Sequence, residues 1–339
     1  MSTVADIGEF GLIFRIKEWV KTGDPRVVRG IGDDTAVLKG NGGKLILFTC
    51  DVQVEGVHFL LSHITPYELG RKSLAINISD IASMGGYSTF ALISLILSPD
   101  TEIDSLKEFY QGLEEEAGKW GVSLVGGNIS KTTGPIVVDI ALLGEVEEDN
   151  LKFRSGARPD DLVLITGEPG RSAAGLRLMH RCLREKFPSL VSAHLTPVPR
   201  VREARLISGF KCVTSMIDVS DGVLKDLYHI LEESSVGAVL REESFQISEE
   251  LREASLILGE DPLSLFLSGG EDYELIFTVS PEEAPVVKKK VEEAGTPVSI
   301  IGEINSEAGN VALRRRDGSL KELSPSGWDH FAKGGCSSF

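Results

Sequence analysis

A series of apolar runs, separated by segments with helical spacing, constrains the fold of this chain more than any other feature of its sequence. The runs have the length and composition of buried strands: "LILFT" (45–49), "FALISLILS" (90–98), "IVVDIALLG" (136–144), "LVLIT" (162–166), "SMID" (215–218), "ELIFTVS" (274–280) and "VSIIG" (298–302). Because helical patterns lie between most of these runs, the alternation predicts an α/β or α+β chain.

Two helices are marked especially clearly. The segment "TPYELGRKSLAINISDIASMGG" begins with Thr65 as an N-cap, Pro66 at the first helical position and Glu68 completing a capping box. The glycine pair at 85–86 ends it. A second helix is predicted over 104–120, where apolar side chains recur along one stripe.

The length of the chain indicates two domains. Its 339 residues, of which 42% are hydrophobic, are too many for one ordinary core. A polar stretch that contains Gly and Pro, "GEVEEDNLKFRSGARPDD" (144–161), follows one predicted strand and precedes another, as is typical of a domain boundary. We therefore predict an N-terminal domain over 1–148 and a C-terminal domain over 149–339.

Acidic residues outnumber basic ones, and the formal net charge is −16. Because polyanions repel each other, this charge argues against duplex nucleic acid or an anionic membrane as a partner. The opening segment "MSTVADIGEFGLIFRIKEWV" carries charges among its apolar residues, which predicts neither a signal peptide nor a membrane-spanning helix. We expect a cytoplasmic protein.

The cysteines are few and scattered. Cys50, Cys182, Cys212 and Cys336 show no C-x-x-C spacing, so neither a zinc site nor a disulfide framework is expected. We predict reduced and mostly buried thiols.

Two adjacent aspartates stand between a Gly-x-Gly and an apolar run in "GIGDDTAVL" (30–38). Carboxylates about 4 Å apart repel each other by roughly 4 kcal/mol at an effective dielectric constant of about 20. A fold that packs Asp33 and Asp34 beside a core therefore needs a cation or hydrogen-bond donors there. The stretch lacks the third glycine of a dinucleotide-binding fingerprint, because Thr35 stands in its place.

Other short polar side chains share a predicted location at strand ends, at helix starts or on one helix face. They are Asp51 after "LILFTC", Asn77 and Asp80 on the face of Met84, Asp218 at a strand end, Ser220 and Asp221 at a helix start, and Glu271 and Asp272 after Gly269-Gly270. Each has a plainer alternative: a turn aspartate, an exposed polar stripe, or a helix cap. Rigidly held oxygen ligands of this kind suit magnesium, with phosphates as further ligands. The sequence has no P-loop.

Taken together, these motifs resemble the thiamine-monophosphate kinase family. The resemblance rests on "GIGDDTAV", "TCDVQVEGVHF", "LAINISDIASMGG", "VGGN", "FRSGARPDD", "IDVSDG", "SGGEDYEL" and "GWDHF", which run almost from end to end of the chain. The wider superfamily, which includes aminoimidazole ribonucleotide synthetase, selenophosphate synthetase and a carbamoyl-dehydrating hydrogenase-maturation protein, uses ATP throughout.

The resemblance implies a two-domain fold of the aminoimidazole ribonucleotide synthetase type, in which the N-terminal sheet forms a barrel across a homodimer. ATP and several magnesium ions would lie between the domains, and whether potassium assists stays open. By motif match, the metal positions are Asp34, Thr49, Cys50, Asp51, Asp80, Asn128, Asp218 and Asp221. The ATP positions are Tyr110, Gly127, Asn128, Arg154 and Ser220, and the thiamine phosphate positions are His58, Glu271 and Trp328.

Two positions depart from the family pattern. Cys50 stands where many members carry Thr, and because a neutral thiol is a poor magnesium ligand, that position would use its backbone carbonyl. Asn128 stands where others carry Asp, and its amide oxygen brings no charge, which leaves the occupancy of one ion open.

The implied reaction is transfer of a phosphoryl group from ATP to thiamine monophosphate. The substrate's own phosphate, with a second pKa of about 6, is mostly deprotonated at neutral pH, so no serine nucleophile or general base is required. Magnesium would neutralise and orient the two polyanions. Asp34 would then face the metal, while Asp33 meets backbone donors in its turn.

Alternatives remain at the level of the sequence. The chain could be another ATP-using member of the superfamily, or a non-catalytic acidic protein that binds divalent metals. Individual residues also have structural alternatives: His58 as a histidine satisfied by backbone, Tyr110 as a core residue, Arg154 as a surface linker residue, and Trp328 as an anchor of the C-terminal segment.

Overall fold

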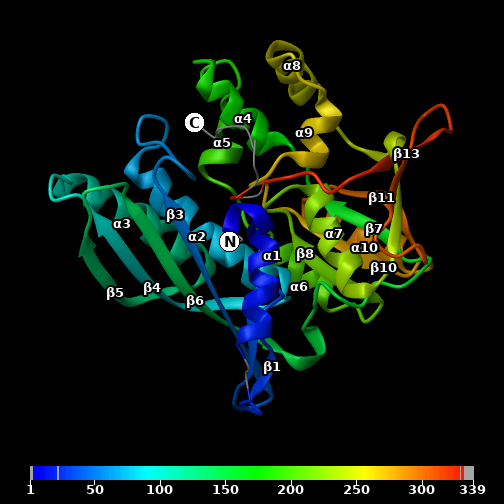
Figure 1. Cartoon of the computed structure of the whole chain (residues 1–339), viewed down its shortest axis with the longest axis horizontal. Coiled ribbons are helices and arrows are strands. Elements are labelled where there is room, and N and C mark those ends of the chain that lie inside the picture. Colours follow the sequence, from blue (N-terminus) through cyan, green and yellow to red (C-terminus); the bar gives the residue numbers. More distant parts are fainter. Residues whose placement is uncertain (1–2, 21–22, 329, 332–339) are drawn as a thin grey trace.

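The computed structural model describes residues 3–20, 23–328 and 330–331, so Cys336 and Asp329 of the "GWDHF" motif lie outside the described residues. Within this range the chain forms two mixed sheets, one from each half of the sequence. Figure 1 shows the two sheets side by side, with helices around and between them. The predicted α/β class is confirmed.

The N-terminal sheet contains six strands in the described residues, in the order β1-β2-β3-β6-β4-β5. They are Val27–Arg29 (β1), Ala36–Lys39 (β2), Lys44–Val54 (β3), Val137–Glu147 (β6), Tyr87–Leu97 (β4) and Ser123–Lys131 (β5). β4 and β5 pair in parallel, and the other pairs are antiparallel. Along β6, buried and half-buried residues alternate, because successive side chains point to opposite faces of a sheet.

Two helices, α2 (Pro66–Ser83) and α3 (Ile103–Trp120), pack against the inner face of this sheet. α2 begins at the predicted capping box: the amide of Glu68 donates to Thr65 Oγ1 at 3.2 Å, and the amide of Thr65 donates to Glu68 Oε2 at 2.8 Å. It ends before Gly85, whose φ of +77° favours glycine. The predicted ends of this helix are confirmed.

The other face of the N-terminal sheet is open in the single chain. Phe48 and Phe90 flank Leu143 across three neighbouring strands, and they are 44% and 50% exposed. In the next row Cys50 and Leu92 flank Ala141. We call this surface the outer sheet face: Phe48, Cys50, Phe90, Leu92, Ala141 and Leu143.

The C-terminal sheet contains seven strands among the described residues, in the order β13-β12-β9-β11-β7-β10-β8. They are Leu320–Leu323 (β13), Val311–Arg314 (β12), Gly237–Arg241 (β9), Val298–Asn305 (β11), Leu162–Thr166 (β7), Leu275–Val279 (β10) and Val213–Asp218 (β8). The central strands β7 and β10 are buried over nearly their full length, as the continuous apolar runs in the sequence predict.

Helices of the C-terminal half surround this sheet. They are Arg171–His180 (α4), Pro188–Leu195 (α5), Val201–Ser208 (α6), Val223–Ser234 (α7), Glu249–Leu258 (α8), Pro262–Ser268 (α9) and Ala284–Glu293 (α10), with short 3₁₀ turns at Glu148–Asn150 and Glu242–Ser244. The first helix, α1 (Val4–Trp19), instead belongs to the start of the chain and contacts α7, where Lys225 lies over the ring of Phe10.

α2 lies between the two halves of the molecule (Figure 1) and contacts β3 and β6 of one sheet and β8 of the other. Most of its residues are buried, and Asn77 is fully so. The alternative of an exposed polar stripe for Asn77 and Asp80 is therefore wrong. Asn77 and Asp80 face β3 at the junction of the two halves instead of solvent.

The structure also bears on the expectations for Asp51, for the cysteines and for a membrane-spanning helix. Asp51 does not end its strand, because β3 continues to Val54. The described thiols, Cys50, Cys182 and Cys212, are free as predicted, but the first two are exposed, so the prediction of mostly buried thiols is wrong. No helix in the described ranges combines the length and apolar character needed to cross a membrane.

Candidate active site

Carboxylates from β3 and α2 meet at the junction of the two halves. Thr49 and Asp51 follow Leu45 and Leu47 on the inner face of β3, which α2 covers. Thr49 Oγ1 donates to Asp80 Oδ2 at 2.6 Å, and the amide of Asp51 donates to Asn77 Oδ1 at 3.0 Å. The strand and the helix thus fix the two aspartates against each other.

The aspartate pair of the "GIGDDTAVL" segment is held by arginines and by backbone. Arg154 Nη2 donates to Asp34 Oδ1, and Ser83 Oγ donates to Asp34 Oδ2 at 2.5 Å. Asp33 Oδ1 accepts from the amides of Asp34 at 3.1 Å and Arg154 at 3.4 Å, and its Oδ2 lies 3.3 Å from Arg29 Nε. The predicted backbone donors for Asp33 are confirmed, and the two arginines supply the positive charge that such a pair requires.

The C-terminal half contributes Asp218 and Asp221. Asp218 ends β8, as predicted, and Ser79 Oγ of α2 donates to its Oδ2 at 2.5 Å. The next residues do not cap α7 with their side chains, because the N-cap is Gly222. Instead Asp226 Oδ2 accepts from the amides of Ser220, Asp221 and Gly222 at 3.0–3.1 Å, and Asp221 Oδ2 lies 2.9 Å from Lys225 Nζ.

These carboxylates lie close enough to one another that the charge of each one affects the pKa of the others. Burial first, and then the charges of Asp221, Asp139 and Asp34, raise the pKa of Asp51 to about 6. Burial and Asp34 likewise raise the pKa of Asp218 to about 8, against the lowering effect of Ser79. Burial, Asp51 and Asp218 raise the pKa of Asp80 well above its ordinary value. The cluster therefore holds more negative charge than its surroundings compensate.

This donor set fits divalent magnesium. The groups that converge are short carboxylates from rigid elements, with the hydroxyl of Thr49 beside them, and hard oxygen ligands of this type are those that magnesium prefers. Arg154 offsets part of the charge through Asp34 and Asp33. Divalent cations would offset more of it.

The other residues predicted to bind metal or nucleotide occupy several different elements. The side chain of Cys50 belongs to the outer sheet face, opposite Asp51. Gly127 and Asn128 pair with Ile93 and Ser94 from the exposed edge strand β5. Tyr110 is 37% exposed on α3 and packs edge-on to Phe109, so it is not a core residue. Arg154 is not a surface residue, since its side chain is only 14% exposed.

The residues predicted for thiamine phosphate lie beside the cluster. His58 Nδ1 accepts from the amide of Val54 at 3.0 Å, and its ring lies 5.0 Å from that of His330. The amide of Trp328 donates to the carbonyl of Asp221 at 3.0 Å, its carbonyl accepts from Lys225 Nζ, and Nε1 donates to His330 Nδ1 at 3.3 Å. The terminal segment is thus tied to the loop that carries Asp221.

Glu271 extends the site toward residues that the sequence did not single out. Its Oε1 lies 2.9 Å from Lys72 Nζ, and its Oε2 lies 3.3 Å from His194 Nδ1. Lys72 could have been noticed, because it stands three residues after Leu69 and four before Ile76 on an apolar helix stripe. His194 carried no such signal, since only the fold brings α5 to this loop.

The neighbouring Asp272, which the sequence analysis grouped with the candidate oxygen ligands, accepts from the amides of Gly170 at 2.6 Å and Ser172 at 2.9 Å. These donors lie at the start of α4, where a carboxylate is favoured by the free amides and the helix dipole. Asp272 therefore anchors the loop that presents Glu271.

Comparison with known proteins agrees with this architecture. The family models described as AIR synthase related protein, N-terminal domain, and AIR synthase related protein, C-terminal domain, match residues 32–146 and 158–313. The thiamine-monophosphate kinase of Bacillus subtilis (strain 168) is 36% identical over 310 residues, which are 89% of this chain and 93% of that protein. The one from Aquifex aeolicus (strain VF5) is 36% identical over 329 residues, which cover 96% and 99%.

Solved structures give the same result. A structure of AaThiL complexed with AMPPCP and TMP matches with a TM-score of 0.85 at 34% identity, and the match covers 97% of this chain and 99% of that one. A crystal structure of thiamine monophosphate kinase from Aquifex aeolicus matches with a TM-score of 0.78 at 33% identity, over 93% and 98%.

Proposed function

Because this chain belongs to the thiamine-monophosphate kinase family and carries both AIR synthase related domains, we propose that it transfers a phosphoryl group from ATP to thiamine monophosphate with the help of several magnesium ions. The observation that carries the proposal is the convergence of Asp34, Asp51, Asp80 and Asp218 at the junction of the two halves. A relative at 34% identity holds AMPPCP and TMP in its solved structure.

Several residues would hold the magnesium ions. The proposed ligands are Asp34, Thr49, Asp51, Asp80, Asn128, Asp218 and Asp221, with the backbone carbonyl of Cys50. When bound, the ions neutralise phosphate charge and orient the reacting oxygens for in-line displacement. The hydrogen bonds from Thr49, Ser79 and Ser83 fix the orientation of Asp80, Asp218 and Asp34, so the site is organised before the substrates arrive.

The nucleotide is assigned to Tyr110, Gly127, Asn128, Arg154 and Ser220. Arg154 supports this role, because its guanidinium is permanently charged, lies in the carboxylate cluster and carries further donors for phosphate oxygens. The backbone of Gly127 comes unusually close to β4: a Cβ at this position would lie 1.8 Å from the carbonyl oxygen of Ile93. Only glycine permits this path of β5.

Thiamine monophosphate is assigned to His58, Glu271 and Trp328. The indole face of Trp328 would attract the permanent positive charge of a thiazolium ring. Glu271 brings an acidic group to the same loop, because its amide binds the carbonyl of Ser220 and the amide of Trp328 binds the carbonyl of Asp221. No serine nucleophile or general base is needed, because the acceptor is a phosphate oxygen that is already mostly deprotonated.

The remaining proposals concern the assembly. We propose that the outer sheet face pairs with its copy in a homodimer, closing a barrel, since the exposed aromatic and aliphatic side chains form a contiguous patch. The two domains are taken as 1–148 and 149–339, and the cytoplasm as the location, on the sequence arguments given above.

The direct test is to incubate the purified protein with ATP, magnesium and thiamine monophosphate and to measure thiamine diphosphate by chromatography. Aminoimidazole and carbamoyl acceptors serve as comparison substrates, and omission of magnesium or exchange of potassium for sodium tests the ions. Release of ADP without thiamine diphosphate would reject the proposed substrate. Tight magnesium binding that ATP does not strengthen would instead favour a purely metal-binding protein.

A further inference from the structure

Lys72 is a fully buried lysine in a place where an aliphatic side chain would suit the helix. It lies on α2 with 0% of its surface exposed. Burying an ammonium group without partners is strongly unfavourable. The position therefore requires an explanation beyond packing.

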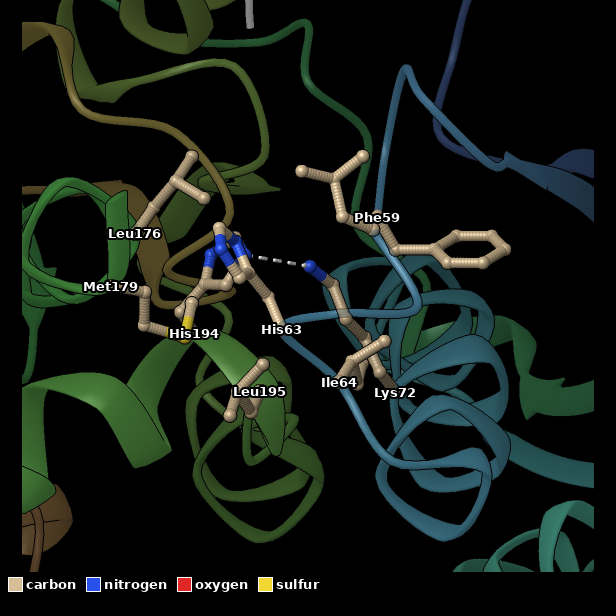
Figure 2. A pocket seen from close by; sticks show the side chains of 9 residues that line it. Phe59, His63, Ile64, Lys72, Leu176, Met179, His194 and Leu195 are labelled. Atoms are coloured by element: carbon tan, nitrogen blue, oxygen red, sulfur yellow. Dashed lines mark hydrogen bonds between the residues drawn. The ribbon is translucent and has the colours of Figure 1, made fainter. Parts of the chain in front are cut away.

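The partners of Lys72 lie in the C-terminal half of the chain. Its Nζ is 2.9 Å from Glu271 Oε1 and 3.5 Å from His194 Nε2. Figure 2 shows Lys72 and His194 facing each other from opposite walls of a small pocket, joined by a dashed line. Phe59, Ile64, Leu176 and Leu195 also line this pocket, together with His63, so Lys72 and His194 interact in mostly apolar surroundings, where their attraction is strong.

His194 connects the other two groups as a neutral ring. Burial first, and then the charge of Lys72, lower the pKa of His194 to about 3. A neutral ring with its proton on Nδ1 accepts from Lys72 through Nε2 and donates through Nδ1 to Glu271 Oε2, which lies 3.3 Å away. Ser172 Oγ, 3.1 Å from the same Nδ1, lies beside this contact.

The backbone of Glu271 is held as firmly as its side chain. Its φ is +63°, a left-handed conformation that is uncommon for a residue other than glycine. Its amide donates to the carbonyl of Ser220 at 2.7 Å, and Tyr273 N donates to the carbonyl of Val219 at 2.8 Å. A strained residue that its surroundings fix so completely is typical of a functional position.

From this geometry we propose that Lys72, together with His194, is a positioning residue that holds the Glu271 carboxylate ionised and oriented toward thiamine monophosphate. The inference rests on the proposed function, since it takes Glu271 as a substrate-binding group. Lys72 itself is too deeply buried to touch the substrate, whereas the side chain of Glu271 is 26% exposed. Lys72 therefore acts on substrate binding through Glu271.

The test compares Lys72→Met with Lys152→Met. Methionine keeps most of the aliphatic chain and removes the charge. Lys152 is a matched control, because it is also buried, at 8% exposure, but donates to the carbonyls of Phe210 and Val213. We expect Lys72→Met to raise the KM for thiamine monophosphate by roughly 10-fold or more and to leave the KM for ATP within about 2-fold. Lys152→Met should lower thermal stability without changing either KM.

A coupled variant keeps the test decisive if Lys72→Met does not fold. The double variant Lys72→Met, Glu271→Gln buries no unpaired charge, and it is compared with Glu271→Gln alone. Equal KM values for thiamine monophosphate in these two proteins support the proposal. A further rise in the double variant, or a Lys72→Met protein that changes only in thermal stability, overturns it. The turnover of the wild type is measured first and tests the proposed function separately.

Discussion

At the scale of single residues, the site is organised by hydrogen bonds to carboxylates that repel one another. Thr49, Ser79 and Ser83 each donate to a different aspartate at 2.5–2.6 Å. These donors stabilise the charged forms, while burial and neighbouring charges act against them. This balance favours binding of a cation by the cluster. Removal of one carboxylate should therefore weaken that binding strongly.

The first prediction concerns the metal ligands. Asp51→Asn or Asp80→Asn should reduce turnover by at least about 100-fold at saturating magnesium, because each removes a ligand charge that stabilises the transition state. Circular dichroism should show an unchanged fold, since an amide keeps the shape of the side chain. Steady-state kinetics provide the measurement.

Asp161→Asn is the matched control for these variants. Asp161 is 5% exposed, and its Oδ2 accepts from the amide of Arg158 and from Thr214 Oγ1 at 2.9 and 2.6 Å, so the substitution disturbs a buried aspartate without touching the cluster. Near-normal turnover of both Asp51→Asn and Asp80→Asn would contradict the metal assignment.

The second prediction follows from the neutral His194. Its folded-state pKa of about 3 lies below the ordinary value of 6.5, so between these values the unfolded chain binds more protons than the folded one. The contribution to stability is therefore complete above about pH 7 and is lost progressively as the pH falls below 6.5. Between pH 7.5 and 5.5 we expect a loss of about 1 kcal/mol in the free energy of unfolding from this residue.

His194→Gln should remove this contribution. The difference in unfolding free energy between wild type and variant, measured by denaturant titration, should be larger at pH 7.5 than at pH 5.5. If the two proteins respond to pH in parallel over this range, His194 is not a buried neutral ring.

At the scale of elements, β3 and α2 bring Asp51 and Asp80 together. The capping box, Pro66 and the terminal glycines made α2 predictable from local sequence. The helix spacing then placed Asn77 and Asp80 on one face of it. By contrast, β5 was missed, because "SLVGGNISK" has glycines where a strand pattern needs apolar residues. Its pairing with β4 is a tertiary effect that no local pattern records.

The same reasoning separates the site residues that the sequence could identify from those it could not. Asp34 and Asp218 could be identified because they stand beside apolar runs, and Asp80 because it shares a helix face with Asn77. Their hydrogen-bond partners, Ser79 for Asp218 and Ser83 for Asp34, carry no sequence signal of this role, because only the fold brings them to the aspartates. His194 contacts Glu271 only because the fold brings α5 to the loop before β10, and no local window of sequence shows this long-range contact.

The third prediction tests β5. Gly127 has a φ of +155°, and a Cβ there would lie 1.8 Å from the carbonyl oxygen of Ile93. Gly127→Ala should therefore displace β5 and raise the KM for ATP by roughly 10-fold or more, because the strand presents the proposed nucleotide residues. Gly118→Ala is the control, since a Cβ at that position meets nothing within 4 Å. Unchanged ATP kinetics in Gly127→Ala would remove β5 from the nucleotide site.

The fourth prediction concerns the terminal segment that carries Trp328. Trp328→Leu keeps apolar contact but removes the π face, which attracts a cation by about 0.5–2 kcal/mol, so the KM for thiamine monophosphate should rise roughly 2- to 30-fold. The KM for ATP should stay nearly constant. Thiamine monophosphate should also quench tryptophan fluorescence less in the variant, where Trp19 and Trp120 give the residual signal.

The hydrogen bonds of Trp328 to Asp221 and Lys225 use its backbone and survive this substitution. Equal weakening of both substrates, or a change in thermal stability alone, would make Trp328 a structural anchor.

At the scale of the whole molecule, the two sheets differ in how completely their faces are covered. The C-terminal sheet has central strands that are buried throughout. The N-terminal sheet is covered by α2 and α3 on one face, while its outer sheet face stays open in the single chain. An exposed apolar surface of this kind is a liability in a monomer unless a partner covers it.

The final prediction is that two chains meet through the outer sheet face. Sedimentation at micromolar concentration should give about twice the chain mass of 36.7 kDa. Phe90→Glu with Leu92→Glu should shift the protein to the monomer, because these side chains are 50% and 47% exposed and flank the centre of the patch, where a buried unpaired charge is strongly unfavourable. Leu256→Glu is the matched control: Leu256 is an apolar residue, 81% exposed on α8 of the other half, so its substitution should leave the mass unchanged. A wild-type monomer would contradict the barrel, and a dimer that survives the double substitution would place the interface on another surface.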